Sequence, residues 1–373
     1  MCIFTQNDIS ICLFLKKNCS RPMNIINRIN AFAKLGDILR NPDASHYHSF
    51  KSEIVQLHNL ILSSTNYNPW FTSDNVKNAI SAIGQSLKTA KIEKWLCSYH
   101  DKKLEPFKPN TIGVVMAGNI PLVGFHDFMS VLLSGQKILA KLSSDDKHLL
   151  PLLAKILVKI EPEFGKHIAF TTDKLESFDA IIATGSNNTS RYFDYYFGKY
   201  PHIIRKNRNG IAVLSGEETS SDFLELGKDI FSYFGLGCRN VSKFFVPKGY
   251  NFDKFFQSIE DYKNTINHSK YVNNYDYNKS IFLVNKVAHL DNGFLLLTEN
   301  TAFSSPISVI YFEAYDDFGA MYNNIQAQHE QIQCIVSIDK KITKRIGPGQ
   351  SQMPELWDYA DGIDTMKFLL SLK

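Results

Sequence analysis

The feature that most constrains the fold is an alternation of short apolar runs with longer amphipathic runs that begins near Thr111. The amphipathic runs carry apolar residues at helical spacing, whereas the short runs have the length and β-branched content of buried strands. The short runs are "TIGVVMAG", "KILAKL", "HIAFT" and "FDAIIATG". This alternation predicts an α/β fold, with a mostly parallel sheet covered by helices and ligands at the carboxyl ends of its strands.

Two further regions flank this series. Residues 23 to about 97 carry apolar residues at helical spacing, which predicts a helical N-terminal layer, and residues 1–22 are expected to be a disordered extension. A second strand and helix series follows residue 214, and it includes an Asn- and Tyr-rich stretch, "NHSKYVNNYDYNKS", that we expect to be a mobile loop before a strand "KSIFLVN". Because single cores stop growing near 250 to 300 residues, a chain of 373 residues is expected to form two domains.

Charge, hydropathy and cysteine spacing exclude several classes of protein. The 41 basic and 37 acidic residues are dispersed, so we expect no nucleic-acid partner, and the densest basic run, "RKNRNG" from Arg205, is interpreted as a solvated turn. No apolar run is long enough to span a membrane, and the first 22 residues lack the pattern of a signal peptide. The six cysteines show no metal-binding spacing, so we expect no metal site and a cytoplasmic location.

The cysteine best placed for chemistry is Cys238, in "YFGLGCRNVSKFFVP". Its neighbouring glycines leave room for a ligand beside the backbone, and Arg239 would favour the thiolate. Cys97 and Cys334 lie in an apolar helix and an apolar strand, which indicates core positions. We therefore predict that Cys238 is a nucleophile, with a buried structural cysteine as the alternative.

Two more stretches carry polar groups at predicted strand ends. Asn119 in "AGNIPLVG" could donate its side-chain amide to an oxyanion, or could be an ordinary turn residue, and the nearby His126 could move a proton or simply pack on its helix. Gly185 and Ser186 in "IIATGSNNTSRYF" join a strand to a helix, an arrangement that suits a phosphate. The same pattern also fits a helix capped by Ser186 or Asn188.

Taken in order, the segments "NIPL", "KILAKLSSDD", "ATGS" and "GLGCRNVSK" resemble the corresponding motifs of the aldehyde dehydrogenase superfamily. The closing stretch "GPGQSQMPELWDYADGIDTMKFLLSLK" resembles the C-terminal signature of the LuxC-type acyl-CoA reductases, a family that includes the fatty acyl reductase of bacterial bioluminescence. The resemblance covers about residues 112–373.

This resemblance implies a Rossmann-like NADP-binding domain within residues 23–213, a catalytic domain at 214–348 and a C-terminal segment at 349–373. It implies that Cys238 is the nucleophile and that Asn119 binds the oxyanion. It further implies cofactor binding by four residues, Lys141, Ser144, Gly185 and Ser186. The partners it implies are a fatty acyl-CoA or acyl-protein donor, an acyl-protein synthetase, and further copies of the chain in a homo-oligomer.

Departures from the superfamily motifs narrow the expected reaction. The segment "RKNRNG" lacks the Glu that activates water in hydrolytic members, and Ala302 lies near the place of a second acid that holds a cofactor ribose. Ser144 stands where NAD-preferring relatives carry a Glu, which favours NADPH. The resemblance thus implies NADPH-dependent reduction of a long-chain acyl thioester to an aldehyde through an acyl-cysteine. The alternatives are a cofactor-independent thioesterase or acyltransferase and a catalytically silent scaffold.

Overall fold

The structure, a computed structural model, describes residues 24–43, 45–99, 104, 106, 108–185 and 187–372. The extension expected at residues 1–22 and the predicted site residue Ser186 lie outside the described residues. The chain forms two compact units: the first runs to Lys206 and resumes at Glu355, and the second is Asn207–Pro354. The functional domain boundaries predicted after residues 213 and 348 remain predictions.

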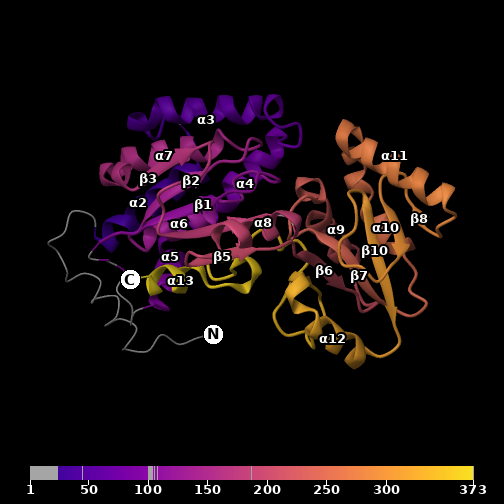
Figure 1. Cartoon of the computed structure of the whole chain (residues 1–373). Coiled ribbons are helices and arrows are strands. Elements are labelled where there is room, and N and C mark those ends of the chain that lie inside the picture. The colour runs from indigo at the N-terminus through magenta and orange to yellow at the C-terminus, as the bar shows by residue number, and fades with distance from the viewer. Residues whose placement is uncertain are drawn as a thin grey trace, which may run out of the picture. The chain divides into compact units, whose positions relative to one another are not determined.

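The first unit opens with the predicted helical layer. Its helices are α2 (Ile25–Arg40), α3 (Lys51–Ser63), α4 (Ser73–Ser86) and α5 (Thr89–Cys97). Phe32, Leu35 and Ile38 of α2 are fully buried, as their helical spacing predicts. Figure 1 shows α3 and α7 (Leu149–Ile160) stacked on one another at the outside of this unit.

A five-stranded parallel sheet forms the centre of the first unit, with strand order β3-β2-β1-β4-β5. The strands are β1 (Thr111–Val115), β2 (Lys137–Lys141), β3 (Ile168–Thr171), β4 (Ala180–Thr184) and β5 (His202–Arg205), and α6 (Phe125–Leu133) and α8 (Asn187–Phe197) are crossover helices. The chain moves outward from β1 through β2 to β3 and then returns to the other side of β1. The carboxyl ends of β1 and β4 therefore flank the topological switch point, where such sheets bind ligands.

The basic run "RKNRNG" is only partly the solvated turn that its composition predicted, since Lys206 and Asn207 are exposed in a loop but Arg205 is not. Arg205 ends β5 and is only 4% exposed. Its Nη2 donates to Asp127 Oδ1 at 2.8 Å and to Thr365 Oγ1 at 2.8 Å, and its Nη1 also donates to the Asp127 carboxylate. The flat guanidinium thus connects β5, α6 and the C-terminal helix α13 (Thr365–Ser371), a buried role that a local count of charges could not predict.

Aromatic and polar contacts attach the C-terminal segment to α5. Trp95 Nε1 donates to the hydroxyl of Tyr359 at 2.6 Å, and the Tyr99 hydroxyl donates to the Asp364 carboxylate at 2.9 Å. His126 Nε2 lies 2.9 Å from the carbonyl oxygen of Leu356. The residues after 354 are therefore an integral part of the first unit.

The second unit contains a seven-stranded sheet of order β12-β11-β6-β7-β10-β9-β8, parallel except for the β8–β9 pair. Its strands are β6 (Asn209–Val213), β7 (Val241–Pro247), β8 (Leu290–Asp291), β9 (Leu296–Glu299), β10 (Val309–Tyr315), β11 (Ile332–Val336) and β12 (Arg345–Ile346). Its α-helices are α9 (Ser220–Phe231), α10 (Asp253–Ser258), α11 (Ser269–Val284) and α12 (Phe318–Ala327). Thr219 and Asp222 form a reciprocal capping box that begins α9.

The predictions of a mobile loop in the Asn- and Tyr-rich stretch and of a strand at "KSIFLVN" were wrong, because both belong to α11. The buried positions of α11 are Tyr271, Tyr275 and Asn278, which have helical spacing but are not aliphatic. The apolar end of α11 is instead exposed, with Val284 at 82%. None of the helices in the described ranges is long and apolar enough to cross a bilayer.

Candidate functional site

Four predicted site residues gather at the carboxyl edge of the sheet in the first unit. Asn119 follows β1, Lys141 is the last residue of β2, Ser144 lies just beyond it, and Gly185 follows β4. Because β1, β2 and β4 are adjacent and parallel, these residues share one edge. Asn119 and Ser144 are exposed, whereas Lys141 and Gly185 are half-buried.

The loop that carries Asn119 is held by the loop that follows β2. A Cβ on Gly118 would lie 2.7 Å from Ser143 Cβ, so only glycine allows the two loops to approach this closely. Leu122 has a φ of 59°, and its backbone N–H donates to Asp146 Oδ2 at 2.7 Å. Burial raises the pKa of Asp146 to about 6. A desolvated carboxylate therefore fixes the conformation of the Asn119 loop.

Gly185 allows α8 to start close to the end of β4. A Cβ at this position would lie 2.9 Å from Phe193 Cε2 and 3.0 Å from the side chain of Thr189. Both contacts are closer than side chains normally make, so a larger residue would push α8 away from the strand. Backbone at the start of α8 is thus kept near the switch point between β1 and β4, a suitable position for a phosphate group.

Cys238 belongs to the second unit and is exposed, whereas Cys97 and Cys334 are half-buried rather than fully in the core. Cys238 and Arg239 are the two central residues of a tight turn, which the Asn240 N–H closes by donating to the Gly237 carbonyl oxygen at 3.0 Å. The turn leads directly into β7. The thiol therefore lies at the amino end of the parallel strands.

The segment just before Cys238 has an unusual backbone. Tyr233, Phe234 and Gly235 have φ values of 52°, 57° and 80°, so three successive residues are left-handed. Each of the two non-glycine residues carries a strain of about 1–2 kcal/mol. The Phe234 ring stacks on His268, with the ring centroids 4.2 Å apart. Strain of this kind persists only where surrounding contacts hold the chain, and it often occurs at functional sites.

Lys243, five residues after Cys238, is fully buried. Its ammonium donates to Glu313 Oε2 at 2.5 Å and to the Thr301 carbonyl oxygen at 2.8 Å, and it lies over the rings of Phe245 and Phe303. Desolvation lowers the pKa of Lys243, and the carboxylate of Glu313 opposes that shift. This cation therefore braces the segment around residues 301–303, which includes Ala302, and does not reach solvent.

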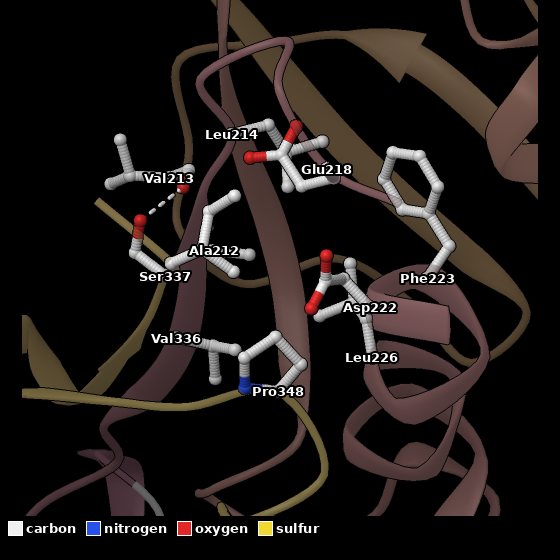
Figure 2. A pocket seen from close by; sticks show the side chains of 11 residues that line it. Ala212, Val213, Leu214, Glu218, Asp222, Phe223, Leu226, Val336, Ser337 and Pro348 are labelled. Carbon is white, nitrogen blue, oxygen red and sulfur yellow. Dashed lines mark hydrogen bonds between the residues drawn. The ribbon is translucent and has the colours of Figure 1, made fainter. Parts of the chain in front are cut away.

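A separate hollow of about 220 Å³ lies at the carboxyl ends of β6 and β11 (Figure 2). This volume includes space that is open to solvent, so the enclosed part is smaller still and does not suit a dinucleotide or an acyl-CoA. Its carboxylates are already engaged in local turns, since Glu218 accepts from the N–H of Ser215 at 2.7 Å and Asp222 from that of Thr219 at 2.8 Å. The hollow is also at the opposite end of the strands from Cys238.

Sequence reasoning missed three residues that shape these regions: Asp146, Asp229 and Asn240. Asp229 accepts from the N–H groups of Gly349 at 2.6 Å and of Ser351 at 2.9 Å, and burial raises its pKa. Asn240 stands two residues after Cys238, a position that could have drawn attention, but the other two have no local signal. The His126 ring packs against aromatic side chains of the first unit, which favours the structural interpretation of that residue over a proton shuttle.

Comparison with known proteins supplies a family and a fold. A family model described as acyl-CoA reductase (LuxC) matches residues 21–253. No curated protein sequence matches the chain at a significant level.

Solved structures of aldehyde dehydrogenases share the fold. An enzyme from Mycobacterium tuberculosis in complex with NAD+ has a TM-score of 0.57 at 12% identity, covering 88% of this chain and 76% of that one. Aldehyde dehydrogenase 21 from Physcomitrella patens, in complex with succinate, has a TM-score of 0.58 at 13% identity over 91% and 79%. A glyceraldehyde-3-phosphate dehydrogenase from Methanocaldococcus jannaschii, complexed with NADP, has a TM-score of 0.55 at 14% identity over 90% and 81%.

Proposed function

The chain belongs to the acyl-CoA reductase (LuxC) family, and on that premise we propose that it reduces a long-chain fatty acyl thioester to the aldehyde, using NADPH and a covalent acyl-cysteine. The observation that carries the proposal is the exposed Cys238 in a tight turn that follows a left-handed segment. The acyl donor is a CoA thioester or an acyl-protein. We propose further that the protein is a cytoplasmic homo-oligomer and that an acyl-protein synthetase is a partner.

In this proposal the Cys238 thiolate attacks the thioester carbonyl, a new carbon–sulfur bond forms, and the thiol of the donor leaves. The amide of Asn119 and the N–H of Cys238 hold the negative oxygen, and each such donor is worth about 3 kcal/mol against the barrier. Arg239 favours the thiolate form of its neighbour. A sulfur nucleophile suits the sequence of steps, because the same thiolate leaves again when the aldehyde is released.

The residues at the carboxyl edge of the first sheet fit a dinucleotide. Lys141 supplies a cation for the adenosine ribose and its phosphate, and Ser144 leaves room for a 2′-phosphate. The close approach of α8 at Gly185 keeps backbone near the pyrophosphate. Ser186, outside the described residues, is proposed as a further pyrophosphate ligand. Bound there, a reduced nicotinamide supplies hydride to an acyl carbonyl. Support comes from the NAD+ and NADP complexes among proteins of the same fold.

The two alternative functions, a thioesterase or acyltransferase and a silent scaffold, would give different results. A thioesterase or acyltransferase would use Cys238 without a nicotinamide and would need a base to activate water. The segment "RKNRNG", where hydrolytic relatives carry that base, has no glutamate, and its Arg205 is paired with the buried Asp127. A silent scaffold would show neither acyl transfer nor reduction.

The test is to mix the protein with NADPH and a long-chain acyl-CoA and to follow the absorbance of the reduced nicotinamide together with aldehyde formation. We expect oxidation in the wild type, its loss in Cys238→Ala, and its retention in Cys97→Ala, a control cysteine in α5 of the first unit. Mass spectrometry after incubation with labelled acyl-CoA alone should place the label on Cys238. Release of CoA without oxidation would support the thioesterase, and no reaction at all would support the scaffold.

Cofactor choice has its own test. Ser144→Glu should raise the KM for NADPH at least about tenfold, because its carboxylate repels a 2′-phosphate, and should leave the KM for NADH unchanged or lower. Equal effects on both cofactors would show that Ser144 does not face the adenosine ribose.

A further inference from the structure

The turn that carries Cys238 is closed twice by one buried residue. Asn240 is 3% exposed, its main-chain N–H donates to the Gly237 carbonyl oxygen at 3.0 Å, and its side-chain Oδ1 accepts from the Gly237 N–H at 2.8 Å. Both hydrogen bonds span Cys238 and Arg239. This reciprocal clasp fixes the path of the backbone on either side of the thiol.

The same side chain also ties the turn to the end of α9. Asn240 Nδ2 lies within hydrogen-bond distance of three carbonyl oxygens, those of Asp229 at 3.0 Å, Ile230 at 3.3 Å and Ser232 at 2.9 Å. Carbonyl groups in the last turn of a helix have no partner within the helix, so a side-chain amide that reaches them takes the place of a cap. The left-handed segment 233–235 that follows is thereby anchored at its start and, through the clasp, at its far side.

The opposite side of the turn rests on β6. A Cβ on Gly210 would lie 2.7 Å from the Arg239 carbonyl oxygen and 2.6 Å from that of Asn240, and the Gly210 N–H donates to the Asn240 carbonyl oxygen at 3.2 Å. The main chain at residues 239 and 240 therefore has no room to shift towards this strand. Asn240 on one side and β6 on the other therefore restrict the movement of the turn.

We propose that Asn240 is the positioning residue for the nucleophile: it sets the orientation and the protonation of the Cys238 thiol without touching substrate. The proposal rests on the proposed function, in which Cys238 carries the acyl group. An amide is suited to the task, because it donates to the helix carbonyls and accepts from Gly237 with one planar group. An aspartate would set a carboxylate against those carbonyl oxygens.

The experiment measures alkylation of Cys238 by iodoacetamide across pH, with peptide mass spectrometry to assign the site. Asn240→Ala is compared with wild type and with Asn278→Ala, a matched control. Asn278 is an equally buried asparagine of the second unit, 6% exposed, whose Nδ2 donates to the carbonyl oxygens of Asn274 at 2.8 Å and Ile307 at 3.1 Å. A purely structural role predicts the same alkylation profile in both variants.

We expect Asn240→Ala to move the midpoint of the pH profile upward by about one unit and to slow alkylation near neutral pH about tenfold, because the thiolate is the reactive form. The reductase kcat should fall with little change in KM, and Asn278→Ala should match wild type in both readouts. A folded Asn240→Ala with the wild-type profile, or equal changes in the two variants, would overturn the proposal.

If Asn240→Ala does not fold, amide hydrogen exchange of the wild type tests whether the two hydrogen bonds across the turn are stable. The clasp predicts slow exchange at Gly237 and Asn240, and rapid exchange at both would refute it. Failure of the proposed function looks different: no acyl label would appear on wild-type Cys238, whatever the alkylation profiles show.

Discussion

Removal of one partner from the buried pair Arg205 and Asp127 should destabilise the first unit severely. The two side chains are 5% and 8% exposed, and two hydrogen bonds join the guanidinium to the carboxylate. Asp127→Leu would remove the carboxylate that pairs with the guanidinium and would keep the Thr365 hydroxyl. Loss of one partner from a buried pair costs about 3–5 kcal/mol. With a urea dependence of about 2–3 kcal/mol per molar, the unfolding midpoint should fall by about 1–2.5 M.

Tryptophan fluorescence is the appropriate assay, because Trp70, Trp95 and Trp357 all lie in the first unit. The signal therefore follows unfolding of this unit alone.

Two further variants separate the charge effect from general damage. The double variant Asp127→Leu with Arg205→Met removes both charges and should recover most of the lost stability. Asp74→Ala, which breaks an exposed pair with Lys77, should change almost nothing. A loss below about 1 kcal/mol in Asp127→Leu, or a double variant less stable than that single variant, would refute the reasoning.

Three other substitutions probe the loops around the site. The pKa of Asp146 is raised from 3.8 to about 6, so the native state binds a proton more readily than the unfolded state and loses stability as the pH rises through that range. Asp146→Asn should therefore increase the free energy of unfolding by up to about 3 kcal/mol above pH 6 and leave it unchanged below about pH 4. Urea titrations at both pH values would measure the difference. Asp229→Ala should release the segment at Gly349, which limited proteolysis would detect as new cleavage near that residue. Gly210→Ala should displace the carbonyl of Asn240 and change the rate of Cys238 alkylation; an unchanged rate would show that the turn tolerates the shift.

The central strands β1 and β4 of the first sheet were predictable because they are buried on both faces. Parallel strands covered by helices read as continuous apolar runs, and β4, "AIIAT", is the clearest case. The edge strand β5 was missed because its four residues, "HIIR", include two that can carry charge. Its arginine is buried only because Asp127, far away in the sequence, meets it there.

Helix α11 was not predicted because its buried residues are polar or aromatic rather than aliphatic. Its buried face consists of Tyr271, Tyr275 and Asn278, so aliphatic periodicity, the usual signal of an amphipathic helix, is absent. The Tyr271 hydroxyl instead reaches the Phe294 carbonyl oxygen at 2.9 Å. Contacts with residues distant in sequence decide which polar side chains are buried, and no local pattern records them.

In the candidate site, too, some residues have a local sequence signal and others do not. The glycine-rich turn around Cys238 and the strand ends at Asn119 and Gly185 carry local signals, and the structure places them in a turn and at strand ends as expected. The burial of Lys243 depends on Glu313, seventy residues away, and the support of the Asn119 loop depends on Asp146 of another loop. The sequence therefore predicted the candidate catalytic and cofactor-binding residues better than the residues that support them.

The path of the chain affects the order in which the protein can form during synthesis. The first unit is interrupted at Lys206 and resumes only at Glu355, and its last helix contributes the fully buried Met366 and Leu369. A ribosome must therefore translate the entire inserted unit before the earlier one can close its core. Until then the first unit exposes apolar surface on the nascent chain. A premature stop codon near the 3′ end of the reading frame would therefore destabilise the first unit, although most of that unit is synthesised first.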